Sequence, residues 1–182
     1  MKKIIALLLL PFMLLTCIGC SDDAFGHQTY TEPEHYHKIF ELTEIRYSED
    51  AFELFPETVD TLSVEDFYCE WELGIVGSAK AEISLSVTYS HADFKTELSR
   101  LKSLSDGKLI FDTENFNYDA YVSVLGYMNT SYYALIDNER STIHYILLQL
   151  INTDDIDINK EFLPFGYSEL GEVKDISYNI YE

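Results

Sequence analysis

The sequence predicts an α+β fold, an antiparallel sheet of about five to seven strands with one amphipathic helix packed on a face. Two neighbouring runs, residues 64–73 and 81–89, alternate apolar and polar side chains, as half-buried strands do. Residues 91–105 carry apolar side chains at helical spacing. Three further runs are rich in Tyr, Val and Ile and are separated by polar breaks, namely residues 118–127, 131–136 and 141–150. These patterns indicate a single acidic domain over residues 39–182.

The two alternating runs are expected to pair as a β-hairpin. Their apolar positions are Phe67, Cys69, Trp71 and Leu73 in the first run and Ala81, Ile83, Leu85, Val87 and Tyr89 in the second. Residues 74–78, which join the runs, contain two glycines and favour a short loop. The polar positions between them, Glu70 and Glu82 included, are expected to face water. Cys69 is therefore placed on the dry face.

The helix is expected to begin at a capping box formed by Ser90 and Asp93. In this arrangement the hydroxyl accepts from an amide of the first turn while the acidic side chain reaches back. The apolar stripe consists of Phe94, Leu98 and Leu101. Gly107 can end the helix in a left-handed conformation. A stripe of this width is stable only when it lies on another element, and a sheet is the expected partner.

The three Tyr-rich runs are expected to form a β-meander. Apolar residues occupy both faces of the third run, with Ile143, Tyr145 and Leu147 on one side and Ile146, Leu148 and Leu150 on the other. Strands of this kind are central or are covered on both faces. Residues 176–180 alternate once more and suggest a last edge strand.

The N-terminal segment has the features of an export signal. Lys2 and Lys3 precede an apolar stretch over residues 4–15, which is shorter than the roughly 20 residues that span a bilayer. Gly19 and Cys20 follow, so the segment resembles the lipobox of bacterial lipoproteins. This resemblance implies removal of residues 1–19, acylation of Cys20, and attachment of the protein to the extracytoplasmic face of the cell membrane. Cys17 is the alternative lipidation site, and a plain secreted protein is the other alternative.

Residues 20–38 are polar and show no hydrophobic period, so they are expected to be a flexible tether. Three histidines lie there, His27, His35 and His37. The imidazoles of His35 and His37 would share a face of a strand and could bind Zn²⁺ or Cu²⁺. A tether does not order further ligands, so solvated histidines are the preferred interpretation.

Charge excludes one class of partner. The chain has 12 basic and 32 acidic residues and a net charge of −20. Binding to nucleic acid depends on Lys and Arg that neutralise phosphates, so no nucleic acid is expected as a partner. Anionic lipid headgroups would repel the domain as well, and a covalent lipid must hold it at the membrane. Removal of Cys17 and acylation of Cys20 would leave Cys69 with no partner for a disulfide.

The motifs assign no catalytic residue, no cofactor and no metal ligand. Residues 154–159 are acidic and invite a calcium interpretation, but Lys160 and Gly166 replace the Gly and Glu that an EF-hand loop needs. Ser99 and Lys102 have the spacing of penicillin-recognising enzymes, whose companion elements do not occur. Carboxylate pairs suited to glycoside hydrolysis stay open because their distance in space is not visible in a sequence.

Tyrosine is abundant in the meander, and Tyr127, Tyr132, Tyr133 and Tyr145 are candidate ligand-binding residues. The preference of Tyr for strands explains the same pattern. Three hypotheses follow. The first is a non-enzymatic module that binds a protein, a peptide or an envelope polymer. The second is an envelope hydrolase with paired carboxylates, and the third is a calcium- or metal-dependent adhesion module.

Overall fold

The computed structural model describes residues 26–42, 52–73, 79–104, 109–127, 129–151, 155–167 and 178–179. Its strands are β1 (Gln28–Tyr30), β2 (Ser63–Leu73), β3 (Ala79–Thr88), β4 (Ile110–Asp112), β5 (Asp119–Tyr127), β6 (Thr130–Asp137), β7 (Thr142–Gln149) and β8 (Tyr178–Asn179). Its helices are α3 (His91–Leu104) and the 3₁₀ segments η2 (Pro33–Glu41), η3 (Phe52–Leu54) and η4 (Lys160–Phe162). Within these residues, no helix is both long enough and apolar enough to cross a membrane.

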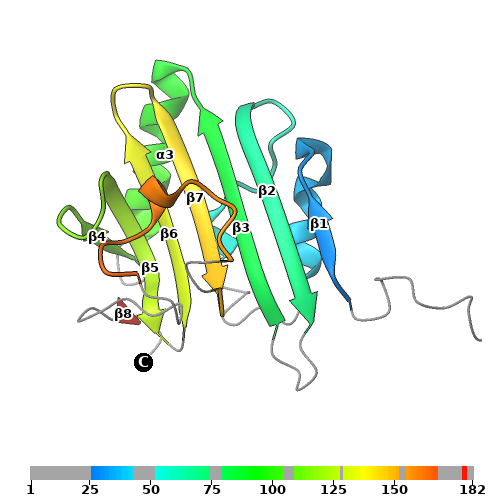
Figure 1. The fold of residues 1–182 in the computed structure, drawn as a ribbon. Coiled ribbons are helices and arrows are strands. Elements are labelled where there is room, and N and C mark those ends of the chain that lie inside the picture. The colour runs from blue at the N-terminus through cyan, green and yellow to red at the C-terminus, as the bar shows by residue number, and fades with distance from the viewer. Residues whose placement is uncertain are drawn as a thin grey trace, which may run out of the picture.

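All strands belong to one antiparallel sheet (Figure 1). The strand order is β1-β2-β3-β7-β6-β5-β4, and β8 pairs with β5 beside this path. The expected hairpin is present as β2 and β3, and the expected meander as β5, β6 and β7. Pairing of β3 with β7 joins the hairpin to the meander. In the chain, α3, β4, β5 and β6 lie between these two strands. The prediction of a sheet-rich antiparallel fold is confirmed.

The sheet is covered on both faces, and each face has its own core. The first core joins residues of β2, β3, β6 and β7 to side chains of η2, η3 and α3, such as Ile39, Leu54 and Leu101. The second core lies on the opposite face, where residues 155–163 pack (Figure 1). Every residue of β7 is buried, which explains the apolar residues at both parities. The expectation of strands covered on both faces is therefore confirmed.

One expected feature of the hairpin is wrong. On β3 the positions expected to face water are buried, with exposed fractions of 0%, 1% and 4% for Glu82, Ser84 and Ser86. The cause is the segment over residues 155–163, whose Ile156 and Ile158 enter the second core. Alternation of polar and apolar residues predicts a strand and its apolar face. It does not show whether the polar face is exposed, because a segment distant in sequence can cover that face.

Helix α3 begins as the capping box predicts. The Ser90 hydroxyl accepts from the Asp93 amide at 3.2 Å and donates to the Asp93 carboxylate at 2.6 Å. Phe94 and Leu101 are buried in the first core. The helix shares this face of the sheet with η2 and η3, so it is one of several elements that cover it. Gly107 lies outside the described residues.

The flexible tether is contradicted over its second half. Residues 28–30 form β1, which pairs with β2, and η2 buries Tyr36 and Ile39 at exposed fractions of 2% and 0%. The Tyr36 hydroxyl also donates to the carbonyl of Pro56 at 2.6 Å. Tyr36, Ile39 and Leu42 are spaced by three residues, which is the period of a 3₁₀ helix. The domain therefore includes these residues. The signal segment and both candidate lipidation sites lie outside the described residues.

Candidate functional site

The tyrosines expected at a binding surface are mainly core residues. Tyr132, Tyr133 and Tyr145 have no exposed area, and Tyr127 is half-buried against the first core. Tyr145 donates to the Glu97 carboxylate at 2.6 Å, whereas the buried Tyr133 hydroxyl has no hydrogen-bond partner within the part of the chain that the structure describes. For these three residues the ligand-binding prediction is wrong, because β6 and β7 are covered on both faces.

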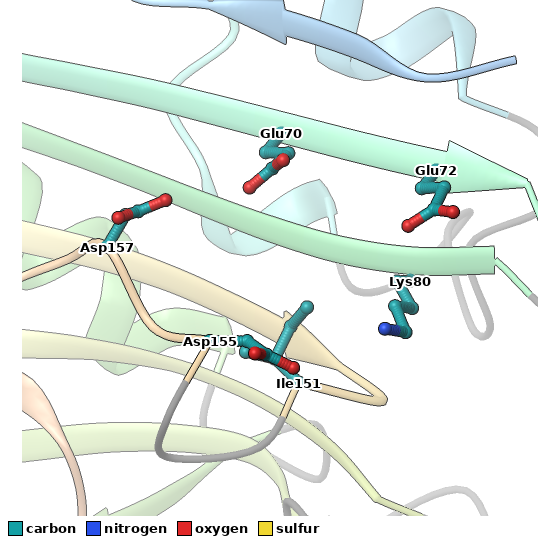
Figure 2. Close-up of a pocket in the computed structure, with 6 residues that line it drawn as sticks. All are labelled: Glu70, Glu72, Lys80, Ile151, Asp155 and Asp157. Atoms are coloured by element: carbon teal, nitrogen blue, oxygen red, sulfur yellow. The ribbon is translucent and has the colours of Figure 1, made fainter.

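A polar pocket of about 370 Å³ lies beside the β2–β3 hairpin, on the face of the sheet that carries the second core. It is lined by Glu70, Glu72, Lys80, Ile151, Asp155 and Asp157. Figure 2 shows Glu70 and Glu72 projecting from β2, while Asp155 and Asp157 come from the segment that follows β7. Four carboxylates against one ammonium give this pocket a strongly negative potential.

Strand register explains how the acidic side chains meet. Side chains two residues apart share a face of a strand, so Tyr68, Glu70 and Glu72 lie together on β2. Glu72 is the cross-strand partner of Lys80, an opposite-charge pair. Glu70 is instead the partner of Glu82, and like charges in this position are unfavourable.

Glu82 is the most unusual residue of the site. Its side chain is fully buried, and its Oε1 accepts hydrogen bonds from the backbone amides of Asp157 at 3.0 Å and Ile158 at 2.8 Å. Its Oε2 has no hydrogen-bond partner among the described residues. Burial raises the pKa of Glu82 to about 7, although the two amides act in the opposite direction. The charges of Asp157 and Glu70 add to the rise in pKa.

Glu70, Glu82 and Asp157 form a cluster in which one carboxylate oxygen of each lies within 4.8 Å of those of the other two. The Tyr68 hydroxyl lies 2.8 Å from Glu70 Oε2 and 2.9 Å from Asp157 Oδ2. It has one proton and can donate to only one of these carboxylates at a time. His27 Nε2 lies 2.7 Å from Glu70 Oε1. We call Glu70, Glu82 and Asp157 the carboxylate cluster.

The remaining sequence candidates have local roles. His37 Nδ1 contacts the carbonyl of Glu34 at 3.1 Å, and the His35 ring lies 5.3 Å from that of Tyr30. Ser99 donates to the carbonyl of Lys95 within α3. The acidic loop does contribute Asp157, but its partners on the hairpin were not predicted. Their signal was the cross-strand position of Glu70 and Glu82, which the hairpin register implies.

The comparisons with known proteins give no relative for this chain. No family model, no curated protein and no solved structure matches it. Function therefore has to be inferred from the pocket and the carboxylate cluster themselves. Both lie on the hairpin face and on the segment at residues 155–158.

Proposed function

We propose that this protein is a lipid-anchored extracytoplasmic binding module without catalytic activity, whose acidic pocket takes a positively charged ligand. The observation that carries this proposal is the lining of the pocket, where Glu70, Glu72, Asp155 and Asp157 surround a cavity with a single lysine. The whole chain has a net charge of −20, so its field adds to that of the pocket and attracts cations. A basic peptide segment or an amine-bearing envelope polymer has the required charge.

An oligolysine peptide is the direct probe of the pocket. We expect the full-length chain to bind it at low ionic strength in a calorimetric titration, and to ignore an oligoglutamate of the same length. Glu72→Gln should weaken binding by about two- to fivefold, because one pocket carboxylate is lost. Asp66→Asn is the matched control, since Asp66 is an exposed residue of β2 outside the pocket lining and loses the same charge. Equal effects of the two substitutions would contradict a role for the pocket.

The lipid anchor is proposed on the lipobox resemblance at Gly19-Cys20. Intact-mass and lipid-labelling measurements on the chain isolated from bacterial membranes test it. Cys20→Ala should abolish the acyl mass and leave the export signal attached, while Cys17→Ala should keep the acyl mass. An unmodified chain that begins at Met1, or acyl mass retained in Cys20→Ala, would refute the assignment.

A hydrolase with paired carboxylates is the alternative with some support, because a pocket with several carboxylates is present and Glu82 has a raised pKa. Glu82 is fully buried, however, and it does not line the pocket. A general acid must reach the atom that it protonates. These properties favour binding over hydrolysis.

A further inference from the structure

We infer that the carboxylate cluster of Glu70, Glu82 and Asp157 is a binding site for one divalent cation of the calcium type. The inference rests on the proposed function, since Glu70 and Asp157 belong both to the cluster and to the lining of the acidic pocket. It gives the buried Glu82 carboxylate a role as a cation ligand, although this residue does not line the pocket.

The spacing of the cluster fits calcium. Ca²⁺ holds carboxylate and carbonyl oxygens at about 2.4 Å, so two ligands of one ion lie at most about 4.8 Å apart. The three carboxylate oxygens satisfy this limit, because they all lie within 4.8 Å of one another. Mg²⁺ demands near-ideal octahedral geometry and usually keeps several waters, whereas Ca²⁺ accepts a flexible arrangement of carboxylate oxygens. Calcium is therefore the better match for a cluster of three carboxylates, and water completes its coordination.

The buried Glu82 supplies an independent reason for a ligand. A carboxylate removed from water is costly unless its oxygens are paired. Oε1 is held by two backbone amides, whereas Oε2 accepts no hydrogen bond from any described residue, although no part of Glu82 is exposed. A cation bound by Glu82, Glu70 and Asp157 would balance the negative charge on this oxygen. It would also offset the repulsion between the carboxylates of Glu70 and Glu82, which face each other on β2 and β3.

The neighbours of the cluster are placed as supporting groups. The Tyr68 hydroxyl bridges Glu70 and Asp157, and His27 contacts the other oxygen of Glu70. Groups of this kind orient metal ligands without contacting the metal. The Tyr68 hydroxyl has one proton and can donate to only one of the two carboxylates at a time. A positive charge between Glu70 and Asp157 would reduce the repulsion that the hydroxyl cannot offset for both. The ion would also tie the segment of Asp157 to the β2–β3 hairpin.

The test uses the full-length chain in detergent, treated with a chelator and then dialysed. Calcium binding is measured by equilibrium dialysis, and melting temperature by circular dichroism, up to about 10 mM CaCl₂ against KCl of equal ionic strength. We expect one Ca²⁺ per chain with a dissociation constant of about 10⁻⁴ to 10⁻³ M, as in extracellular modules. The melting temperature should rise by several degrees with calcium and by less with Mg²⁺.

Substitutions identify the ligands. Glu82→Gln keeps the shape of the side chain and its carbonyl for the two amides, and it should weaken calcium binding by at least about tenfold. Asp157→Asn should act in the same direction, whereas Asp66→Asn should bind as the wild type does. Unchanged calcium binding in Glu82→Gln, or no binding at the highest calcium concentration, overturns the inference.

The outcome is separable from that of the proposed function. Oligolysine binding that depends on Glu72, without calcium binding, refutes the cation site and leaves the pocket proposal intact. Calcium binding that depends on Glu82, without oligolysine binding, supports the cation site and refutes the proposed class of charged polymer ligand.

Discussion

Glu82→Gln is expected to raise the free energy of unfolding of the cation-free protein by about 3 kcal/mol at about pH 8. The buried carboxyl has a pKa of about 7, against an ordinary value of 4.5. Each unit of pKa difference between the folded and unfolded chain corresponds to about 1.4 kcal/mol. At about pH 8 the wild-type carboxyl is ionised in both states, so the whole cost of burying its charge is present. Glutamine avoids this cost and still accepts from the amides of Asp157 and Ile158.

The sign of the pH dependence follows from the raised pKa. The folded chain holds the Glu82 proton more tightly than the unfolded chain does, so between about pH 4.5 and 7 stability falls as pH rises. Glu82 interacts electrostatically with the carboxylates of Glu70 and Asp157 and with the hydroxyls of Tyr133 and Tyr167. Burial raises the pKa of both tyrosines, so they stay neutral in this window. Glu82→Gln should therefore flatten the slope.

Urea unfolding in EDTA at about pH 5 and pH 8 measures both quantities. At the lower pH the difference between the wild type and Glu82→Gln should fall to about 1 kcal/mol or less, because the carboxyl is then protonated in the folded chain and ionised only in the unfolded chain. Asp66→Asn, at an exposed position of β2, should change stability by no more than about 0.5 kcal/mol at either pH. A loss of stability in Glu82→Gln at about pH 8 would show that the ionised carboxylate is a stabilising group in the absence of a cation.

The fold was predictable where local patterns decide it. Alternation in β2 and β3 marks the two strands and their apolar face, and the stripe of α3 and the mixed parity of β7 indicate how many sides of these elements are covered. The segment η2 was missed because Tyr36 and Ile39 follow a period of three, which resembles neither a strand nor an α-helix. Its polar residues instead suggested a tether.

The candidate site was less predictable because burial of Glu82 is a property of tertiary structure. Alternation places Glu82 and Ile83 on opposite faces of β3, and a polar residue on the face away from the core usually contacts water. The segment that buries it follows β7 and lies more than 70 positions further along the chain. Glu70 and Glu82 could have been paired from the hairpin register, which is regular from the pair Leu73 and Ala79 through Glu70 and Glu82. Of the carboxylate cluster, the acidic loop over residues 154–159 contains only Asp157.

Arg100→Ala is expected to lower the free energy of unfolding by about 2–3 kcal/mol. The guanidinium joins α3 to η3, since it donates to the carbonyls of Glu53 at 2.6 Å and Leu54 at 2.8 Å. It also donates to both carboxylate oxygens of Glu97, at 2.8 and 2.6 Å. Glu97 is only 12% exposed, so removal of the arginine leaves a poorly hydrated charge and unpaired carbonyls. Alanine is a better helix former than arginine, and helix propensity therefore cannot cause the loss.

A double-mutant cycle separates the charge from the rest of the contact. Glu97 also accepts from Tyr145 at 2.6 Å, and Glu97→Gln keeps an oxygen for this bond while it removes the charge. Arg100→Ala should then cost at least about 1 kcal/mol less in the Glu97→Gln background, because no ionised group is left unpaired. Arg100→Lys should recover only part of the loss, since an ammonium cannot match the planar fork that serves two carbonyls and a carboxylate. Lys95→Ala, at an exposed position of the same helix, is the control and should change stability by no more than about 0.5 kcal/mol. Equal costs of Arg100→Ala in both backgrounds would place the stabilisation in the carbonyl contacts to η3 and not in the ion pair.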